Sequence, residues 1–203
     1  MDISQIKELY VLQVKEIAEF FGFETRNKYQ IKNSSGEDLL FAAETSKGFI
    51  ETLKRLFLGH WRTFEIRFYR PDKQIYLTAI HPFRWIFRSF EIYDHNNSKI
   101  GSLEQRFAIF SKKFDVLDKN GKTILNVSSP LFKVWTFPFF HNGVEKARIE
   151  KKWSGLLKEA FTDADNFRIE FIRPDLEDDV KKILLASGIF IDLLYFEKKA
   201  GSN

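Results

Sequence analysis

The sequence contains no cysteine. This absence excludes disulfide bonds, cysteine-ligated zinc, thiol catalysis and S-acylation, and nothing in the chain requires an oxidising compartment. The first residues, MDISQIKELY, also lack the basic start, long apolar region and small-residue cleavage site of a secretory signal. The sequence therefore predicts a cytoplasmic protein.

The chain also lacks an apolar run of the length typical of a membrane span. The longest, from Ile183 to Phe196, has about 14 residues, whereas a span needs roughly 20. Asp192 lies in this run, and a carboxylate near the centre of a span costs about 2.5 to 3.5 kcal/mol, which offsets most of the contribution of the Leu, Ile and Phe residues. The run could be a membrane span or a helix buried in a protein core, and its short length and the charge of Asp192 favour the core helix.

The stretch from Val180 to Glu197 is apolar on nearly every side of a helical wheel, interrupted by Ser187 and Asp192. Such a helix must be covered on all sides. Asp175 offers an N-cap, acidic residues follow in the first turn, and lysines come after the last, which suits the helix dipole. We expect a central helix over 175–197 with these residues in the core: Ile183, Leu184, Ile189, Phe190, Asp192 and Leu193. A carboxylate there must be protonated, paired or hydrogen-bonded, so Asp192 is either a structural acid or a group that handles ions or lipid headgroups.

At 203 residues the chain has the length of one domain, 1–203, and no Pro- or Ser-rich linker divides it. Aromatic residues make up 16% of the sequence, including 23 Phe, which excludes a disordered chain. The net charge of +4 is compatible with an anionic membrane surface or with nucleic acid, but is specific to neither.

Alternating polar and apolar segments recur along the chain in pairs separated by turn residues, with no helical pattern between them. This predicts an antiparallel meander of about ten to twelve strands over 23–172, preceded by a capping segment at 1–22 in which Tyr10 to Val14 could equally be a strand. Closure of the sheet around the apolar helix would leave no exposed edge, so we expect a mainly β protein, a closed antiparallel barrel with a central helix. The expected strands are 28–32 with 38–44, 62–69 with 74–80, 90–93 with 99–106, 113–117 with 122–127, 132–139 with 144–150, and 167–172.

Two stretches do not fit a strand with one wet face. Lys47 to Trp61 places apolar side chains on one helical face and cations on another, and Ile80 to Phe90 interleaves aromatic residues with arginines. Both are typical of a contact with a membrane surface, where aromatics lie at headgroup level and cations face anionic lipid. A helix that covers one end of a barrel, or a crossover packed on the core, would look similar. The candidate membrane contacts are Phe57, Trp61, Phe83, Arg84, Trp85, Phe87 and Arg88.

An enzyme is the function class with least support. The four histidines, His60, His81, His95 and His141, are scattered, and the sequence has no HExxH, no GxSxG and no phosphate-binding glycine loop. Nucleic-acid binding is also not expected, because it would rest on charge alone without a recognition helix or a stacking motif.

Several blocks, spread in order over nearly the whole chain, resemble the phospholipid scramblase family and its tubby-like and LURP-one-like relatives. The blocks are Gly22-Phe23-Glu24 with Asn27-Lys28-Tyr29, Phe41-Ala42-Ala43-Glu44, Pro82 with Arg84, Lys152-Trp153-Ser154-Gly155, the run from Glu159 to Phe167, and Ile191-Asp192 with Tyr195-Phe196-Glu197. The resemblance implies a barrel of about twelve strands around a hydrophobic C-terminal helix. It also implies ATP-independent, calcium-stimulated movement of phospholipids between leaflets at an anionic membrane. Because a barrel filled by its own helix offers no polar groove for a headgroup, such movement would need self-association, thinning of the bilayer or release of the helix.

The alternative within the same resemblance is a tubby-like module that binds lipid headgroups, protein or nucleic acid and transports nothing. Family members often carry acylated cysteines, so in this cysteine-free chain we expect exposed aromatics and cations to replace the acyl anchors. The resemblance places calcium ligands at Asp163, Asp165 and Asn166. Counted as an EF-hand loop from Asp163, however, the fifth position is Phe167 and the twelfth is Pro174, neither of which offers a side-chain oxygen. A calcium site and an acidic pair that caps a turn therefore both stay open.

Overall fold

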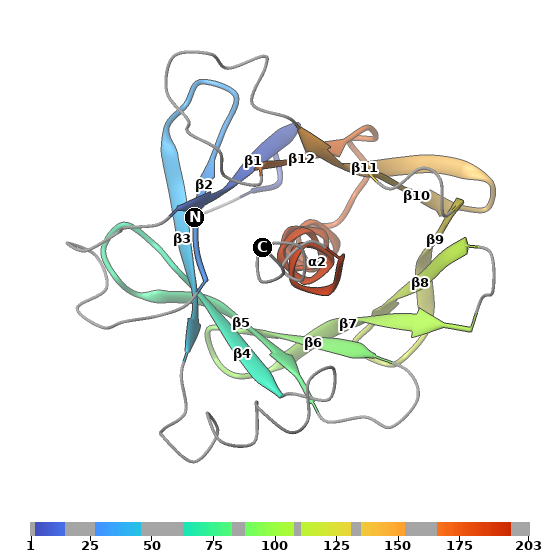
Figure 1. The fold of residues 1–203 in the computed structure, drawn as a ribbon, viewed down its shortest axis with the longest axis horizontal. Coiled ribbons are helices and arrows are strands. Elements are labelled where there is room, and N and C mark those ends of the chain that lie inside the picture. Colours follow the sequence, from blue (N-terminus) through green and yellow to red (C-terminus); the bar gives the residue numbers. More distant parts are fainter. Residues whose placement is uncertain are drawn as a thin grey trace, which may run out of the picture.

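The computed structural model describes residues 3–14, 27–45, 63–82, 88–107, 111–130, 135–152 and 166–195. In this part of the chain, antiparallel strands form one closed barrel, and the helix α2 (Asp178–Tyr195) lies inside it (Figure 1). The predicted closed antiparallel barrel of about twelve strands with a C-terminal helix is confirmed. The strands are β1 (Glu8–Val14), β2 (Lys28–Lys32), β3 (Asp38–Thr45), β4 (Phe64–Tyr69), β5 (Ile75–His81), β6 (Ser89–Asp94), β7 (Lys99–Arg106), β8 (Ser111–Asp118), β9 (Thr123–Pro130), β10 (Thr136–His141), β11 (Val144–Lys152) and β12 (Asn166–Phe171).

Each strand pairs with its neighbours in sequence, and the barrel closes where β1 meets β12. The closing register runs from Glu8 opposite Glu170 to Leu12 opposite Asn166. Closure leaves no strand with a free edge, which removes a common site of aggregation.

The expected capping segment at 1–22 is wrong for Glu8–Val14, which form β1 within the barrel wall. Leu9 and Val11 are fully buried, while Tyr10 lies on the other face and donates a hydrogen bond of 3.2 Å to the Glu8 carboxylate. Local sequence left the choice open because one partner of this strand, β12, comes from the other end of the chain. Helical spacing at Ile3 and Ile6 then favoured a cap.

The turns between hairpin strands follow from their residue types. Asn142 and Gly143 link β10 to β11 with φ of 49° and 77°, the two positive values that a two-residue type I′ turn requires. In a second kind of turn, an aspartate side chain accepts backbone N–H groups two and four residues further on. Asp94 does so after β6 and Asp118 after β8, at 2.8 to 2.9 Å.

The helix α2 fills the barrel interior. Its residues Leu184, Leu185, Ala186, Ile189 and Phe190 have no exposed surface. A Cβ atom at Gly101 of β7 would collide with the carbonyl oxygen of Leu117 and come within 2.5 Å of Cδ1 of Ile183, so only glycine lets the wall approach the helix this closely. No helix in the described ranges has the length and apolarity needed to cross a bilayer.

The predicted start of the helix is three residues early. Asp175 does not cap α2, which begins at Asp178; its carboxylate instead forms an ion pair of 2.7 Å with Lys146 of β11. The N–H groups of Ile172 and Arg173 bond to the carbonyl of Lys146 and hold the connector against the wall. The residues between β12 and α2 connect the barrel wall to the barrel axis, so the helix begins only after them.

Candidate functional site

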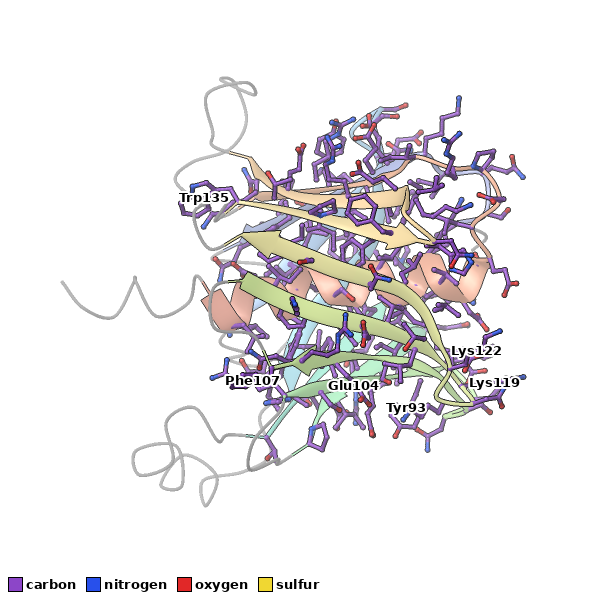
Figure 2. The ribbon with its side chains drawn as sticks, turned by 90° about the vertical axis from the view of Figure 1, so that its right-hand side faces the viewer. Tyr93, Glu104, Phe107, Lys119, Lys122 and Trp135 are labelled. Atoms are coloured by element: carbon purple, nitrogen blue, oxygen red, sulfur yellow. The ribbon has the colours of Figure 1, made fainter. Side chains whose placement is uncertain are left out.

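The two ends of the barrel differ in their connections. At one end, named here the hairpin end, the strands are joined by the short turns at 33–37, 70–74, 95–98, 119–122 and 142–143. At the other, named the loop end, strands meet at residue pairs such as Thr45 with Glu65 and Phe64 with His81, and the longer connections leave and return. Figure 2 shows Lys119 and Lys122 at the hairpin end, with Phe107 and Trp135 at the loop end.

The described strand ends that flank the two basic-aromatic stretches of the sequence lie at the loop end. The connection from Thr45 to Phe64 contains the first stretch, and the connection from His81 to Ser89 contains most of the second. These connections join consecutive, hydrogen-bonded strands, β3 to β4 and β5 to β6, so they leave the same quarter of the barrel rim. Most of the candidate contacts lie outside the described residues: Phe57, Trp61, Phe83, Arg84, Trp85 and Phe87.

Arg88 is the candidate contact that the structure describes. It is partly buried, and its carbonyl accepts a hydrogen bond of 2.8 Å from the N–H of Gln105. This bond ties the start of β6 to the end of β7 at the loop end.

The structure adds two aromatic residues that sequence reasoning missed. Phe107, directly after β7, has 73% of its surface exposed, the largest exposure among the large apolar residues described. Trp135, before β10, is partly exposed, with the ammonium of Lys151 5.2 Å from its ring centroid. Phe107 could have been found from the end of the β7 alternation at Arg106, after which the apolar run FAIF begins.

Charged side chains accompany these aromatics on the outer wall. The guanidinium of Arg106, about half exposed, lies 2.9 Å from the carboxylate of Asp115 on β8. Burial raises the pKa of Asp115, the Arg106 charge lowers it, and the Glu104 carboxylate raises it further. The loop end thus carries an exposed aromatic ring next to a permanent cation, a combination that suits the headgroup region of a bilayer.

Beneath the loop end, the C-terminal half of α2 is held by aromatic packing. The rings of Phe190 and Phe90 stack with centroids 4.8 Å apart, and Phe64 and His81 lie within 6.4 Å of Phe190. The expected core residues Ile183, Leu184, Ile189, Phe190, Asp192 and Leu193 are all at most 7% exposed. Asp192 accepts a hydrogen bond of 2.9 Å from the hydroxyl of Tyr29.

Two of the three expected calcium ligands, Asp163 and Asp165, lie outside the described residues. Asn166, the third, begins β12 at the loop end and is 6% exposed. Its Oδ1 atom is buried and has no hydrogen-bond partner in the described structure, and an amide oxygen is a ligand type that calcium accepts. Asn166 is the expected ligand whose surroundings the structure describes, and the neighbouring Phe167, which has no side-chain oxygen, is buried in the wall.

Comparison with known proteins gives one consistent result. The model of the Scramblase family matches residues 2–198. Human "Phospholipid scramblase 2" is 30% identical over 211 residues, covering 97% of this chain and 69% of the relative. Human "Phospholipid scramblase 1" is 30% identical over 96% of this chain, and a Schizosaccharomyces pombe "Phospholipid scramblase family protein" is 23% identical over 98% of it. The chain spans 64% and 61% of the length of these last two relatives.

Among solved structures, an X-ray structure of a protein from Arabidopsis thaliana matches with a TM-score of 0.48 and 11% sequence identity. The match covers 92% of this chain and 90% of the other.

Proposed function

Because the chain belongs to the scramblase family, we propose that it binds anionic phospholipid membranes peripherally through its loop end and promotes ATP-independent movement of phospholipid between leaflets. The observation that carries this proposal is the topology. The strands that flank both basic-aromatic stretches, β3 to β4 and β5 to β6, have those ends at the end of the barrel where Phe107 is exposed, and Trp135 is at the same end. A single surface with aromatic rings and cations can then enter the headgroup layer while the polar barrel wall stays in water.

The structure limits how such a protein could move lipid. In the described part of the chain, α2 occupies the barrel interior, and most of its buried side chains are apolar, which does not suit a charged headgroup. Lipid would therefore pass outside the barrel, where inserted loop-end aromatics thin or disorder the bilayer, or between self-associated copies. The work of the chain itself is then to bind the surface, to orient the loop end toward it and to keep the helix out of the bilayer.

A second function is favoured by the same occupied interior. A barrel sealed by its own helix is suited to binding lipid headgroups at the loop end without moving lipid across the membrane. This non-transporting module would bind vesicles and leave the distribution of lipid between leaflets unchanged.

One experiment separates the two functions. Proteoliposomes with a trace of fluorescent phospholipid are treated with dithionite, which quenches only the outer leaflet, with and without calcium. Transport predicts quenching beyond the outer-leaflet fraction, and the non-transporting module predicts flotation with the vesicles and no gain in quenching. Loss of both flotation and quenching would contradict the proposed membrane function as a whole.

The basic-aromatic contact is tested by a triple variant, Trp85→Ala, Phe87→Ala and Arg88→Ala. Loss of one basic residue near an anionic surface weakens the free energy of membrane binding by about 1 kcal/mol, and loss of two aromatic side chains buried in the membrane surface weakens it further. We expect the variant to float poorly with phosphatidylserine-containing vesicles. Flotation equal to that of the parent would contradict the assignment of this stretch.

Calcium dependence is part of the proposal through Asp163, Asp165 and Asn166. Isothermal titration with calcium is expected to show heat that is lost in a variant with Asp163→Asn, Asp165→Asn and Asn166→Leu. No heat from the parent at millimolar calcium would remove calcium from the account and leave the acidic pair as a turn cap.

A further inference from the structure

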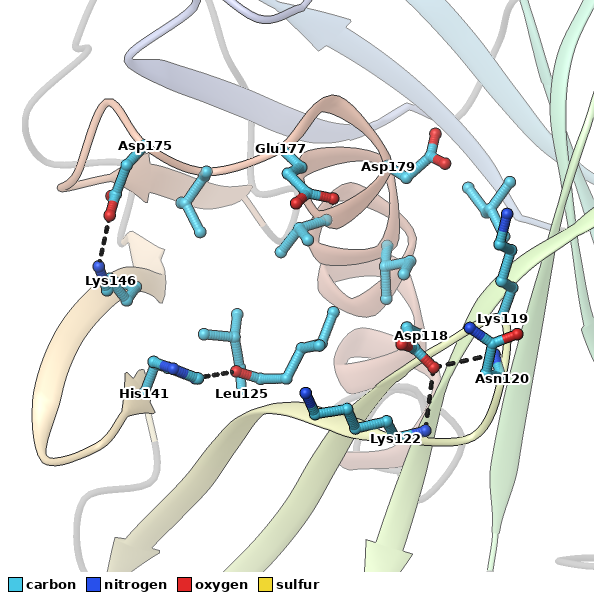
Figure 3. Close-up of a pocket in the computed structure, with 15 residues that line it drawn as sticks. Asp118, Lys119, Asn120, Lys122, Leu125, His141, Lys146, Asp175, Glu177 and Asp179 are labelled. Atoms are coloured by element: carbon cyan, nitrogen blue, oxygen red, sulfur yellow. Dashed lines mark hydrogen bonds and ion pairs between the residues drawn. The ribbon is translucent and has the colours of Figure 1, made fainter.

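A cavity of about 520 Å³ opens at the hairpin end, between the start of α2 and the barrel wall (Figure 3). Its floor is apolar and nearly buried, formed by Ile100, Leu125, Val180 and Ile183, each at most 9% exposed. Charged side chains from the β8–β9 turn, β11 and the start of the helix surround its mouth. The cavity therefore has an apolar floor and a charged entrance.

The position of the helix in the barrel accounts for the cavity. The main contacts of α2 are with β7, β12, β6 and β1, and the cavity lies toward the ends of β8, β9 and β10. The imidazole of His141 is fixed at this edge, with Nδ1 2.8 Å from the carbonyl of Ile124 and Nε2 3.2 Å from the amide of Asn142. Because a carbonyl oxygen only accepts, Nδ1 is the donor in the contact with Ile124.

Most of the acids at the mouth already have partners. Asp175 pairs with Lys146 at 2.7 Å, and Asp179 pairs with Lys182 at 3.0 Å. Asp118 accepts N–H groups from its own turn. Glu177 is the lining acid that remains without an ion pair in the described part of the chain.

Two cations at the mouth, by contrast, are available. Lys119 and Lys122 flank the β8–β9 turn, are exposed, and make no ion pair with any described residue. Figure 3 shows the side chain of Lys122 extending from the turn toward Leu125 and His141, and that of Lys119 extending toward the side of Asp179.

From this arrangement we propose that the hairpin end holds a binding site for an amphiphile with one apolar chain and an anionic head, a carboxylate or a phosphate. The apolar chain would lie on the Ile100, Leu125, Val180 and Ile183 floor, and the head would bind Lys122 at the entrance, with Lys119 adding positive charge to the same turn. A volume of about 520 Å³ is within the range of roughly 300 to 1,000 Å³ typical of small-ligand sites. The site is at the opposite end of the barrel from the proposed membrane contact, so it is a further activity and does not depend on that contact.

The test is isothermal titration of the full chain with three twelve-carbon amphiphiles below their micellar concentrations: sodium laurate, dodecyl phosphate and the uncharged dodecyl maltoside. Inorganic phosphate is the fourth probe. We expect saturable one-to-one binding of laurate, of dodecyl phosphate or of both. Dodecyl maltoside and inorganic phosphate are each expected to bind at least about tenfold more weakly, because each lacks one half of the recognised chemistry.

Variants locate the site. The double change Lys119→Glu and Lys122→Glu is expected to weaken binding by about tenfold or more, and Ile124→Trp, which adds bulk to the lining, is expected to do the same. Lys7→Glu is the control, an exposed lysine at the same end of the barrel that does not line the cavity. Circular dichroism establishes that each variant is folded.

Several results would overturn the proposal. These are equal binding of dodecyl maltoside, equal binding of inorganic phosphate, binding unchanged by the Lys119 and Lys122 substitutions, or no binding of either anionic amphiphile. Vesicle flotation, measured on the same variants, distinguishes this failure from failure of the membrane contact, because the substitutions leave the loop end intact.

Discussion

The hydroxyl of Tyr29 on β2 donates a 2.9 Å hydrogen bond to Oδ2 of Asp192 on α2. Both residues are at most 2% exposed. The bond joins the first half of the barrel wall to the C-terminal helix and gives the one carboxylate of the helix interior a polar partner. It fixes the rotation of the helix, because a turn of α2 about its axis would leave this carboxylate facing apolar side chains.

Tyr29→Phe should therefore destabilise the fold. Loss of the donor leaves a buried acceptor less well satisfied, which costs about 1 to 3 kcal/mol in the free energy of unfolding. Urea unfolding measures the loss. The control is Tyr93→Phe, which removes a bond of the same length to Glu91 on the outer wall, where water can replace it. A loss no larger than in the control would contradict a structural role for the Tyr29 bond.

Gly101→Ala tests the close approach of the wall to the helix. The added methyl group meets the Leu117 carbonyl and Cδ1 of Ile183, so the wall or the helix must shift, at a cost of about 1 to 3 kcal/mol. Gly188→Ala is the matched control, because its new methyl group meets only the side chain of Ile169, at 3.1 Å, and alanine favours a helix. Thermal unfolding should show a large loss for the first variant and little for the second. Equal effects would mean that α2 does not lie against β7 as described.

The first turn of α2 gives a pH prediction. Burial alone would lower the pKa of Lys182, but the carboxylates of Asp178 and Asp179, at 2.7 and 3.0 Å, raise it above its ordinary value. The folded state thus binds this proton more tightly than the unfolded state. The resulting stabilisation is fully present below the unfolded pKa of about 10.4 and is lost as pH rises through the folded pKa.

Lys182→Met should then lower the free energy of unfolding by about 1 kcal/mol at neutral pH. The difference from the parent should shrink above about pH 10.4. Urea unfolding over this pH range checks the effect, with Lys7→Met as the exposed control. A difference that stays constant with pH would rule out the ion pairs as its source.

Lys181 secures the N-terminal residues to the helix. Lys181 is 2% exposed. Its ammonium donates to the carbonyls of Ile3, Ser4 and Ile6 and lies 5.1 Å from the ring centroid of Phe171. Lys181→Met removes these charge-assisted hydrogen bonds, each of which contributes about 1.5 to 3 kcal/mol to stability. We expect faster amide hydrogen exchange at residues 3–6 than in the parent. Unchanged exchange there would show that other contacts hold this segment.

Sequence alone predicted the hairpins because their signals are local. Alternation identifies each strand, and Asn142-Gly143 or Asn120-Gly121 identifies the turn between two of them. The apolar surface of α2 likewise required a cover on all sides, which a closed barrel provides. These features depend on residues close together in the chain.

The features that the sequence did not predict depend on residues that are far apart in the chain. β1 is a strand because β12 and β2 pair with it, and Asp175 is not a cap because Lys146 holds it away from the helix. The hairpin-end cavity was not anticipated for the same reason. Lys119 and Lys122 look like ordinary turn residues until the fold places them over Ile183.

We propose that the loop end of the barrel, and not the hairpin end, contacts the membrane. Since the chain has no cysteine, one introduced cysteine can carry an environment-sensitive fluorophore at a single position. Phe107→Cys labels the loop end, and Asn96→Cys labels an exposed hairpin turn at the other end. On addition of phosphatidylserine-containing vesicles, the account predicts a blue shift and a gain in fluorescence at position 107 and no change at position 96. A response at position 96 without one at position 107, or no response at either, would contradict it.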